Sequence, residues 1–307
     1  MPIRDLAVLA ATLVALLLIA PPHASAQQRQ QDSKEPERRA PIPRVKLDTA
    51  AMDKLGWRLG SQAYTFRKLS LFETIDLLDA MGIRYIEMYP GQRFSPMKGD
   101  LKASHDMPDE LVEELIAKLK EKNVTPVLYG VVPLPNDEAK CRKVFEYAKK
   151  LKLEGIVSEP PLDAIPLIDR LAGEYGIKVA IHDHPKPSLY WDCKTVIEAT
   201  KDAKHVAACA DIGHWRRSGL TPAECVKMLE GKIISLHVKD IDEKKEDVPW
   251  GTGTVDVRAV MEELHRQEAK NLIFSIEYEK GEGDELIANV AKSVEFFNQV
   301  ASELAAK

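Results

Sequence analysis

Short apolar runs rich in β-branched residues alternate along this chain with longer segments whose apolar and polar positions follow helical spacing. The runs predict eight strands, over residues 59–64, 84–88, 125–131, 155–158, 178–182, 206–211, 233–238 and 272–277. Successive strands start 23 to 41 residues apart, which accommodates a strand, a helix and their two loops. Eight such units predict a parallel sheet covered by helices.

Helix-capping signals support the segments between the strands. The stretch from Ser70 to Glu73 is a capping box, and so is the stretch from Thr221 to Glu224, which has proline at the first helical position. A third segment carries apolar residues at positions 112, 115, 116 and 119, the spacing of one helix face that packs on a core.

The eightfold rhythm predicts a single-domain (β/α)₈ TIM barrel over residues 53–307. These are about 255 residues, the usual size of such a barrel. A doubly wound open sheet is the alternative, but no G-x-G-x-x-G fingerprint follows the first predicted strand.

The first 26 residues have the features of a secretory signal peptide. Arg4 precedes a mostly apolar run over residues 6–20, and Ala24-Ser25-Ala26 forms a small-residue cleavage site. A membrane anchor is the alternative, but the run is shorter than the roughly 20 residues that span a bilayer. Residues 27–52 are rich in Gln, Arg, Glu and Pro, which predicts a disordered leader. We therefore expect export to the periplasm or the extracellular space, with no membrane attachment once the signal is removed.

Charge and cysteine content argue against several kinds of partner and site. The net charge is −5 and the predicted barrel has no basic block, which disfavours nucleic acid or an anionic membrane as the main partner. The four cysteines are scattered without a C-x-x-C pair, so we expect neither a disulfide framework nor a zinc ribbon.

Histidines and acids gather at the ends of the predicted strands, where TIM barrels carry their catalytic groups. Seven of the eight histidines follow the signal peptide, and four of these lie at strand ends together with three acids. The group consists of Glu159, His182, His184, Asp211, His214, His237 and Glu277. One such histidine alone would more often be a hydrogen-bonded core residue, but the whole group indicates a site.

The fifth strand ends in His182-Asp183-His184. Side chains two positions apart on a strand share a face, so both histidines can point into the barrel while Asp183 points away. Imidazoles and carboxylates from neighbouring strands make a mixed nitrogen and oxygen site. Such a site suits Mn²⁺, Zn²⁺, Co²⁺, Fe²⁺ or Mg²⁺ better than a soft metal, so we expect a divalent metal as cofactor.

Five segments stand at or after the predicted strand ends. They are His182-Asp183-His184-Pro185, Asp211-Ile212-Gly213-His214, Leu236-His237-Val238-Lys239-Asp240, Gly251-Thr252-Gly253-Thr254-Val255-Asp256 and Ile276-Glu277. In their order and placement, the chain resembles the xylose isomerase-like TIM barrels, also called the sugar phosphate isomerase/epimerase family. The resemblance covers roughly residues 57–305 and is specific for the family rather than for one substrate.

The resemblance implies a divalent metal held by four side chains from the fifth to the eighth strand. Asp211, His237 and Glu277 match three of these positions. Many members have Glu as the strand-five ligand, whereas this chain offers His182 as the first choice and His184 as the second. This departure weakens the simplest epimerase mechanism, in which metal-bound Glu residues on strands five and eight form the acid–base pair.

The family chemistry also assigns roles in proton transfer. Removing a proton next to a carbonyl forms an enediolate, whose charge a divalent metal stabilises as a Lewis acid. Glu277 is the expected base, and His184 or His214 the expected partner acid. In similar members the histidine of the Asp-x-x-His motif contacts substrate hydroxyls, which also makes His214 a substrate-binding candidate.

Weaker candidates complete the predicted substrate site. Lys239, Glu159, Glu87 and Trp250 are expected to contact substrate, with a solvated or packed side chain as the alternative for each. Trp250 lies in a glycine-containing loop after the seventh strand, where an indole can pack on a sugar ring. Further aromatic contacts are expected from Tyr64, Tyr89 or Trp215.

The sequence thus predicts an exported, divalent-metal-dependent isomerase or epimerase of a carbohydrate. A lyase of the same fold, which would catalyse β-elimination from a 3-keto-glycoside or dehydrate an inosose, is the first alternative. Export favours this lyase somewhat and argues against a sugar phosphate, because sugar phosphates are scarce outside the cytoplasm. A non-catalytic sugar-binding protein is a further alternative, and a metal-dependent endonuclease is disfavoured because no basic surface is predicted.

Overall fold

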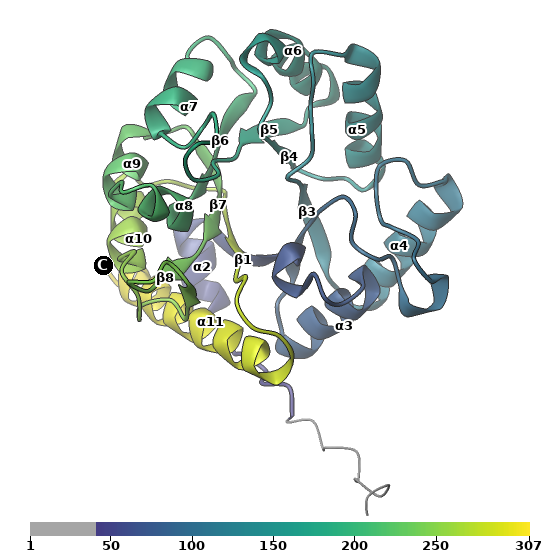
Figure 1. Ribbon diagram of the computed structural model, residues 1–307. Helices are drawn as coiled ribbons and strands as arrows, with labels where there is room; N and C mark the ends of the chain where they lie inside the picture. The colour runs from purple at the N-terminus through teal and green to yellow at the C-terminus, as the bar shows by residue number, and fades with distance from the viewer. Residues whose placement is uncertain (1–40) are drawn as a thin grey trace, which may run out of the picture. The chain divides into compact units, whose positions relative to one another are not determined.

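The computed structural model describes residues 41–307, which fold into a closed barrel of eight parallel strands with helices outside it (Figure 1). The strands are β1 (Trp57–Gln62), β2 (Tyr85–Met88), β3 (Thr125–Tyr129), β4 (Gly155–Ser158), β5 (Lys178–Ile181), β6 (Val206–Asp211), β7 (Ile233–Val238) and β10 (Leu272–Ile276). The first strand, β1, pairs with both β2 and β10, which closes the sheet. The predicted single-domain (β/α)₈ TIM barrel is therefore confirmed.

The observed strands lie close to the predicted ones. The bounds of β4, β6 and β7 are as predicted, and the others differ by at most two residues. The strand β1 ends at Gln62 because its side chain accepts the Tyr64 backbone N–H at 3.1 Å and begins the 3₁₀ turn η1 (Ala63–Phe66). His182 and Glu277 each lie one position beyond their strand, at the carboxyl end of the barrel.

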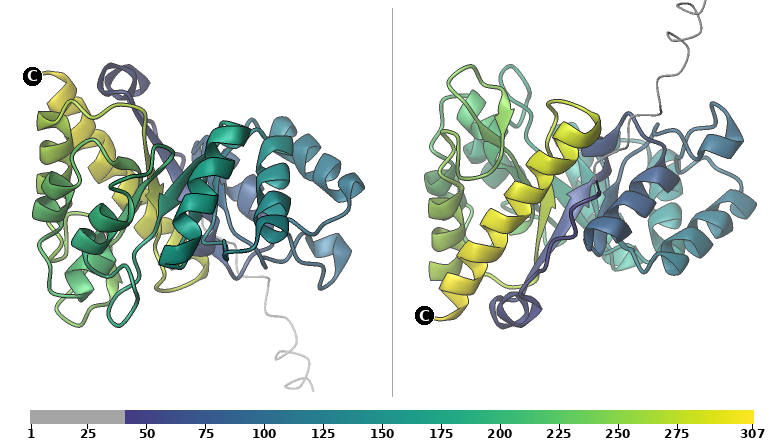
Figure 2. Two further views of the ribbon diagram at one scale, coloured as in Figure 1. Left: turned by 90° about the horizontal axis from the view of Figure 1, so that it is seen from above. Right: turned by 90° about the horizontal axis from the view of Figure 1, so that it is seen from below.

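Ten helices with described residues surround the barrel. They are α2 (Thr49–Leu55), α3 (Leu71–Met81), α4 (Asp109–Glu121), α5 (Glu138–Lys150), α6 (Ile165–Tyr175), α7 (Cys193–Ala199), α8 (Ile212–Arg217), α9 (Pro222–Met228), α10 (Val257–Arg266) and α11 (Gly283–Ala305). The last helix, α11, packs beside α2 on the outside of the barrel (Figure 2). Short 3₁₀ turns η2 (Pro96–Lys98) and η3 (Leu162–Ala164) and the antiparallel pair β8 (Asp240–Ile241) and β9 (Asp247–Val248) lie in loops.

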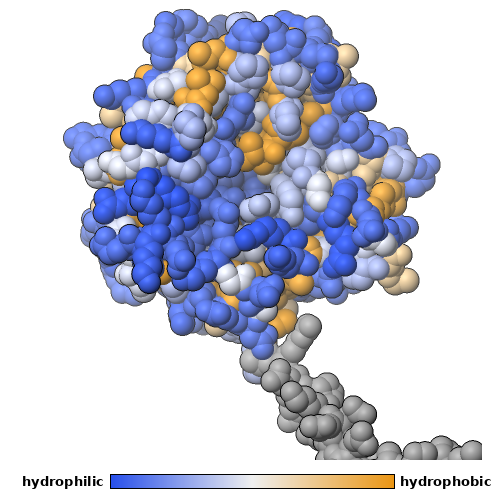
Figure 3. Space-filling model, viewed as in Figure 1, coloured by the Kyte–Doolittle hydropathy of each residue, from blue (hydrophilic) through white to orange (hydrophobic). Residues whose placement is uncertain are grey.

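Two surface properties follow from the side chains of these elements. Within residues 41–307, no helix combines the length and the apolar run that crossing a bilayer would require. The face seen in Figure 1 is mostly hydrophilic, with hydrophobic residues in small separate groups (Figure 3).

The ordered fold begins earlier than the sequence predicts. A disordered leader was expected up to residue 52, whereas α2 already begins at Thr49. Asp48 caps this helix by accepting the Ala51 N–H, and its other oxygen accepts a hydrogen bond from Ser302 of α11 at 2.9 Å. Contacts with the far end of the chain thus order a segment whose composition alone predicts disorder. The predicted signal peptide and the leader up to residue 40 lie outside the described residues.

Of the two predicted capping boxes, one is present. Ser70 accepts the Glu73 backbone N–H at the start of α3, and Glu73 accepts the Ser70 backbone N–H at 2.8 Å. Thr221 makes no side-chain cap on α9, because the Glu224 N–H donates to the Thr221 carbonyl oxygen instead, at 3.1 Å. The second capping box is therefore wrong, although Pro222 does occupy the first turn.

The difference between these two caps gives a test of local stability. We expect Ser70→Ala to lower the free energy of unfolding by about 1 kcal/mol, because the Glu73 N–H in the first turn of α3 loses its side-chain acceptor. Thr221→Ala is the matched control and should change stability by less than about 0.5 kcal/mol. Urea unfolding followed by circular dichroism measures both, and equal losses in the two variants would contradict the assignment.

The core contains most of the predicted apolar stripe of α4 and all four cysteines. Val112, Leu115 and Leu119 are buried, and Ile116 is partly buried against them. The cysteines are buried free thiols at positions 141, 193, 209 and 225. They pack as small apolar side chains in the helical layer and the barrel.

Candidate active site

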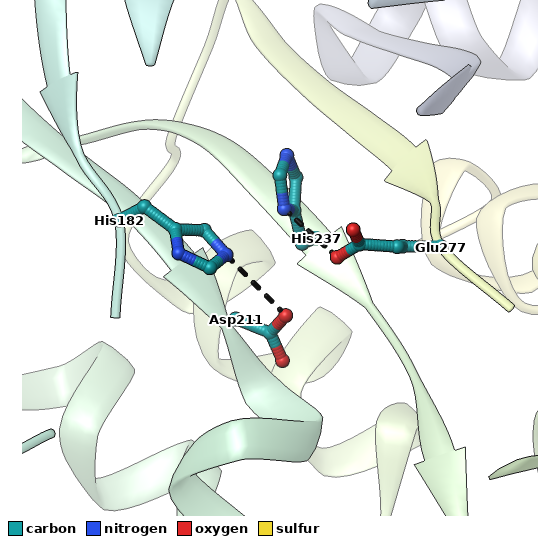
Figure 4. A group of neighbouring side chains, drawn as sticks. All are labelled: His182, Asp211, His237 and Glu277. Atoms are coloured by element: carbon teal, nitrogen blue, oxygen red, sulfur yellow. Dashed lines mark ion pairs between the residues drawn. The ribbon is translucent and has the colours of Figure 1, made fainter. Parts of the chain in front are cut away.

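Four side chains converge at the carboxyl ends of neighbouring strands (Figure 4). His182 follows β5, Asp211 ends β6, His237 lies in β7 and Glu277 follows β10. One ligand atom from each lies within 4.8 Å of all the others, and all four residues are buried. The structure therefore brings together the three ligand candidates implied by the family pattern, with His182 in the fourth position.

The donor atoms of this group fit a divalent metal. His182 Nε2 and His237 Nδ1 are buried and have no hydrogen-bond partner among the described residues. His182 Nε2 lies 3.6 Å from Asp211 Oδ2, and His237 Nδ1 lies 3.0 Å from Glu277 Oε2. Buried polar atoms without partners are rare in proteins. A metal between two imidazoles and two carboxylates would satisfy all of them.

A carboxylate holds the second nitrogen of each imidazole. His182 Nδ1 lies 2.9 Å from Glu159 Oε1, and His237 Nε2 lies 2.9 Å from Glu87 Oε1. In a neutral imidazole the nitrogen beside the carboxylate carries the proton, so the lone pair of the other nitrogen is directed at the ligand group. Histidines that bind metals are commonly oriented in this way.

The positions of Glu87 and Glu159 correct the expectation that they contact substrate. Glu87 is completely buried and accepts hydrogen bonds from Gln62, His237 and Ser275 at 2.9 to 3.0 Å. It therefore lies beneath the site and orients His237. Glu159 is less buried, but its oxygens are engaged by both strand-five histidines and by the Ser188 hydroxyl at 3.0 Å. Its role in this arrangement is to position the histidines.

His184 is the exposed histidine of the group. Its side chain is 51% exposed and its Nδ1 bonds Glu159. The hydrogen bond to Glu159 raises the pKa of His184, against the smaller effect of burial. Its ring stacks on that of His214 with centroids 5.2 Å apart. His184 thus stands beside the candidate metal ligands rather than among them, with a ring that can carry a proton.

His214 is a neutral hydrogen-bond donor in this structure. Arg217 Nη1 donates to His214 Nδ1 at 3.1 Å, so the ring proton is on Nε2, which lies 3.5 Å from Asp211 Oδ2. Burial lowers the pKa of His214 to about 2, which keeps the ring uncharged at neutral pH. The geometry therefore favours substrate contact through Nε2–H over a role as a charged acid.

Asp211 has two functions that its place between β6 and α8 explains. Its Oδ1 accepts the His214 backbone N–H at 2.8 Å and so caps α8. Its Oδ2 faces His182 and accepts a hydrogen bond from Lys239 at 2.5 Å. Asp183, which points away from the cavity, fixes the backbone of Asp211 by accepting its N–H at 2.8 Å. Burial, and then the charge of Asp211, raises the pKa of Asp183.

A cavity of about 300 Å³ opens beside these groups. Its lining consists of Gln62, Tyr64, Tyr89, Gly130, Val131, His182, His184, His214, Glu277 and Glu279. Tyr64 and Tyr89 meet edge to face with ring centroids 5.2 Å apart and form an aromatic wall. A larger hollow of about 710 Å³ lies along α6 and α7, but none of the candidate ligands lines it. The smaller cavity is therefore the one that adjoins the candidate ligands.

Three expected substrate contacts are absent from this cavity. Trp250 is 2% exposed and its backbone N–H donates to Ser293, so the indole packs in the core and cannot stack on a sugar. Trp215 is also completely buried. Lys239, expected to hold a substrate oxygen, is buried against Asp211 and Glu277. Of the expected aromatic residues, Tyr64 and Tyr89 do line the cavity.

Sequence reasoning missed three residues of the site. Glu279 lines the cavity and lies 3.3 Å from Lys239. Its spacing from Glu277 is the i, i+2 relation that pairs His182 with His184, so the same rule would have found it. Gln62 is the last residue of β1, and Arg217 is one helical turn from His214. Both positions were visible in the sequence but carry residue types that are common on surfaces.

Two comparisons with known proteins bear on the family. The chain is 32% identical to a protein of uncharacterised function from Parabacteroides distasonis ATCC 8503, over 80% of this chain and 99% of that one, with a TM-score of 0.65. The sequence profile described as xylose isomerase-like TIM barrel matches residues 162–300. The chain belongs to the xylose isomerase-like TIM-barrel family. The resemblance expected from its motifs is thereby confirmed, and the matched range includes all four candidate ligands.

Two solved structures of lower identity share the fold. A D-tagatose 3-epimerase-like protein is 19% identical, over 80% of this chain and 98% of its own, with a TM-score of 0.64. The probable 3-DHS dehydratase AsbF from Bacillus anthracis is 15% identical, over 78% of this chain and 98% of its own, with a TM-score of 0.61. At these identities the likeness shows the fold alone. No curated protein matches the chain.

Proposed function

We propose that this xylose isomerase-like barrel is an exported, divalent-metal-dependent isomerase or epimerase of an unphosphorylated carbohydrate. The observation that carries the proposal is the pair of unpartnered imidazole nitrogens that face two carboxylates beside a cavity. A mixed site of this kind suits Mn²⁺, Zn²⁺, Co²⁺, Fe²⁺ or Mg²⁺. Bound there, the metal would supply a Lewis acid for the carbonyl and the neighbouring hydroxyl of a sugar.

Glu277 is the proposed base. Burial alone would raise its pKa, but the charge of Lys239 outweighs this and lowers it, so the carboxylate stays ionised. Its Oε2 contacts those two residues, whereas no hydrogen bond from the described residues engages Oε1. Because the carboxylate lines the cavity, Oε1 is the atom available to take a proton from the carbon next to the carbonyl.

His184 and His214, which also line the cavity, have different proposed tasks. His184 has a raised pKa and an exposed side chain, so its ring can carry a proton. It is the proposed acid, which donates this proton to the substrate. His214, held neutral by burial and by Arg217, donates its Nε2–H to a substrate hydroxyl. Glu159 keeps His184 in place through Nδ1, which leaves Nε2 of that ring for the substrate.

The charge of the cavity supports a substrate without phosphate. Two glutamates, Glu277 and Glu279, line it, and no lysine or arginine is among its lining residues. Phosphate sites in proteins instead gather arginine, lysine or helix N-termini. Tyr64 and Tyr89 offer aromatic faces and hydroxyl groups of the kind that suit a neutral sugar ring.

A lyase is the second candidate, and the identity of the strand-five residue favours it. With His182 in place of glutamate, only one carboxylate of the ligand set, Glu277, both lines the cavity and is available as a base. One base and one separate acid suffice for proton abstraction followed by loss of a leaving group. The fold shared with a probable dehydratase is compatible with this chemistry.

Solvent exchange separates the candidates. Metal-loaded protein is incubated with free sugars and with 3-keto-glycosides in deuterated water, and products are followed by NMR. We expect deuterium next to the carbonyl of an isomeric sugar. Exchange accompanied by release of an aglycone would assign the lyase reaction instead, and no exchange with any substrate would leave the sugar-binding protein as the better explanation.

Replacing the proposed base should stop exchange. We expect Glu277→Gln to slow deuterium incorporation by at least about 100-fold, since an amide cannot accept the proton. Glu282→Gln, which changes an exposed glutamate of the neighbouring loop, is the matched control and should exchange at the wild-type rate. Metal content measured in parallel separates loss of the base from loss of a ligand. A wild-type exchange rate in Glu277→Gln would show that another group takes the proton.

A further inference from the structure

Lys239 is a completely buried lysine inside the candidate metal centre. Its ammonium lies 2.5 Å from Asp211 Oδ2, bonds Glu277 Oε2 and lies 3.3 Å from Glu279 Oε1. The first two oxygens are the same atoms that face His182 and His237. A permanent positive charge is therefore held by the carboxylate oxygens that would also hold a metal.

The fold directs this side chain into the centre by two local features. Lys239 follows β7 two positions after His237, so its side chain lies on the same side of the strand. Gly213, in the first turn of α8, leaves the room for its stem, because a Cβ at Gly213 would lie 2.5 Å from Lys239 Cβ. The lysine thus occupies a space that any other residue at position 213 would close.

The surroundings fix the charge state and exclude a nucleophilic role. Its Nζ contacts three carboxylates, Asp211, Glu277 and Glu279, so its surroundings hydrogen-bond the protonated form. The side chain therefore remains an ammonium, which has no lone pair to attack a carbonyl. A buried ammonium with such partners acts through its charge and its N–H groups.

The charges of the centre show what the ammonium changes. Asp211 and Glu277 contribute two negative charges, and the imidazoles of His182 and His237 contribute none when they are ligands. A divalent ion alone would make the sum of these groups zero, whereas the ion together with Lys239 makes it plus one, which the charge of Glu279, 3.3 Å from the ammonium, offsets. Without metal, Lys239 reduces the negative charge of two carboxylates that are buried side by side.

We propose that Lys239 is an internal counter-cation of the metal centre, which stabilises the barrel when no metal is bound and weakens metal affinity when one is. This inference rests on the proposed function, because it needs the four-ligand site to bind a divalent ion. It predicts that removing the charge of Lys239 tightens divalent-metal binding.

The test measures binding and stability rather than turnover. Mn²⁺ binding by isothermal titration calorimetry at pH 8 and thermal unfolding of the chelator-treated protein are compared for wild type, Lys239→Met, Glu279→Gln and the double variant. We expect Lys239→Met to bind Mn²⁺ at least about tenfold more tightly, because a charge that repels the ion is gone. We also expect it to unfold at a lower temperature without metal, because two buried carboxylates lose their partner.

Glu279→Gln supplies the control of opposite sign. It removes a negative charge near Lys239, so Mn²⁺ binding should weaken. The change should be smaller than in Lys239→Met, because the Glu279 side chain is 34% exposed and its charge is screened by solvent. The double variant restores the local charge and should bind with nearly wild-type affinity, and it serves as the folded test protein if Lys239→Met alone does not fold.

The outcomes distinguish the two proposals. Mn²⁺ binding that is unchanged or weaker in Lys239→Met, or a double variant that does not return toward wild type, would overturn the counter-cation and leave the proposed function intact. A wild-type protein that binds no divalent ion would overturn both. An unchanged unfolding temperature of metal-free Lys239→Met would remove the stabilising half of the inference.

Discussion

Asp211→Asn is expected to abolish divalent-metal binding and activity while leaving the fold in place. The substituted amide keeps an oxygen that can accept the His214 backbone N–H, so the cap of α8 survives. At the Oδ2 position, however, an NH₂ group would face both Lys239 and the metal site. We expect metal affinity to fall by more than about 100-fold, since even residues behind the ligands cost 10- to 100-fold.

Calorimetry with Mn²⁺ and elemental analysis of the purified variant measure this effect. Asp137→Asn is the matched control, because Asp137 caps α5 through the Lys140 backbone N–H in the same way and is neither a candidate ligand nor a lining residue of the cavity. It should retain wild-type metal content and activity. Unchanged metal content in Asp211→Asn would show that the group of four is not the metal site.

Glu87→Met is expected to have the second largest effect, although Glu87 is not itself a candidate ligand and does not line the cavity. Its carboxylate is the only acceptor recorded for His237 Nε2 and also accepts from Gln62 and Ser275. An apolar side chain would leave these donors buried without a partner, at a cost of about 3 kcal/mol in the free energy of unfolding. The His237 ring could then place its proton on Nδ1, and metal affinity should fall by about 10- to 100-fold.

Two milder variants show whether orientation of His237 is the cause. Glu87→Gln keeps an acceptor for His237 Nε2 and should recover most of the metal affinity. Ser275→Ala removes one of the three donors and should leave Mn²⁺ binding unchanged. If Glu87→Met lost stability but bound Mn²⁺ as tightly as wild type, Glu87 would have a packing role without influence on the ligand. Urea unfolding and calorimetry give the two readouts.

The barrel and the ligand positions follow from local features that a sequence displays. Each strand is a short apolar run, and Asp211, His237 and Glu277 stand at or beside the ends of such runs. Parallel strands in a closed barrel bring these ends together whatever the length and conformation of the loops. The choice between His182 and His184 needed coordinates, because both lie on the same face and only the depth of each ring in the barrel distinguishes them.

The depth of polar side chains was the property that the sequence did not reveal. Lys239 and Glu87 look like surface or pocket residues, yet both are completely buried because partners distant in sequence neutralise or bond them. The hydrogen bond between His237 and Glu87 joins positions 150 residues apart. Trp250 was expected in the cavity because its loop looks exposed in the sequence. In the structure its backbone N–H donates to Ser293 of α11 and its side chain is buried in the core.

The two halves of the barrel carry different parts of the site. All four candidate ligands come from β5 to β10, whereas the tyrosines, Gln62 and the Gly130–Val131 backbone of the cavity wall follow β1 to β3. Substrate preference can therefore diverge by changes in the amino-terminal half while the metal chemistry is inherited unchanged. Chimeras that exchange this half between relatives would change substrate specificity, provided that Glu87, which orients His237 from β2, is retained.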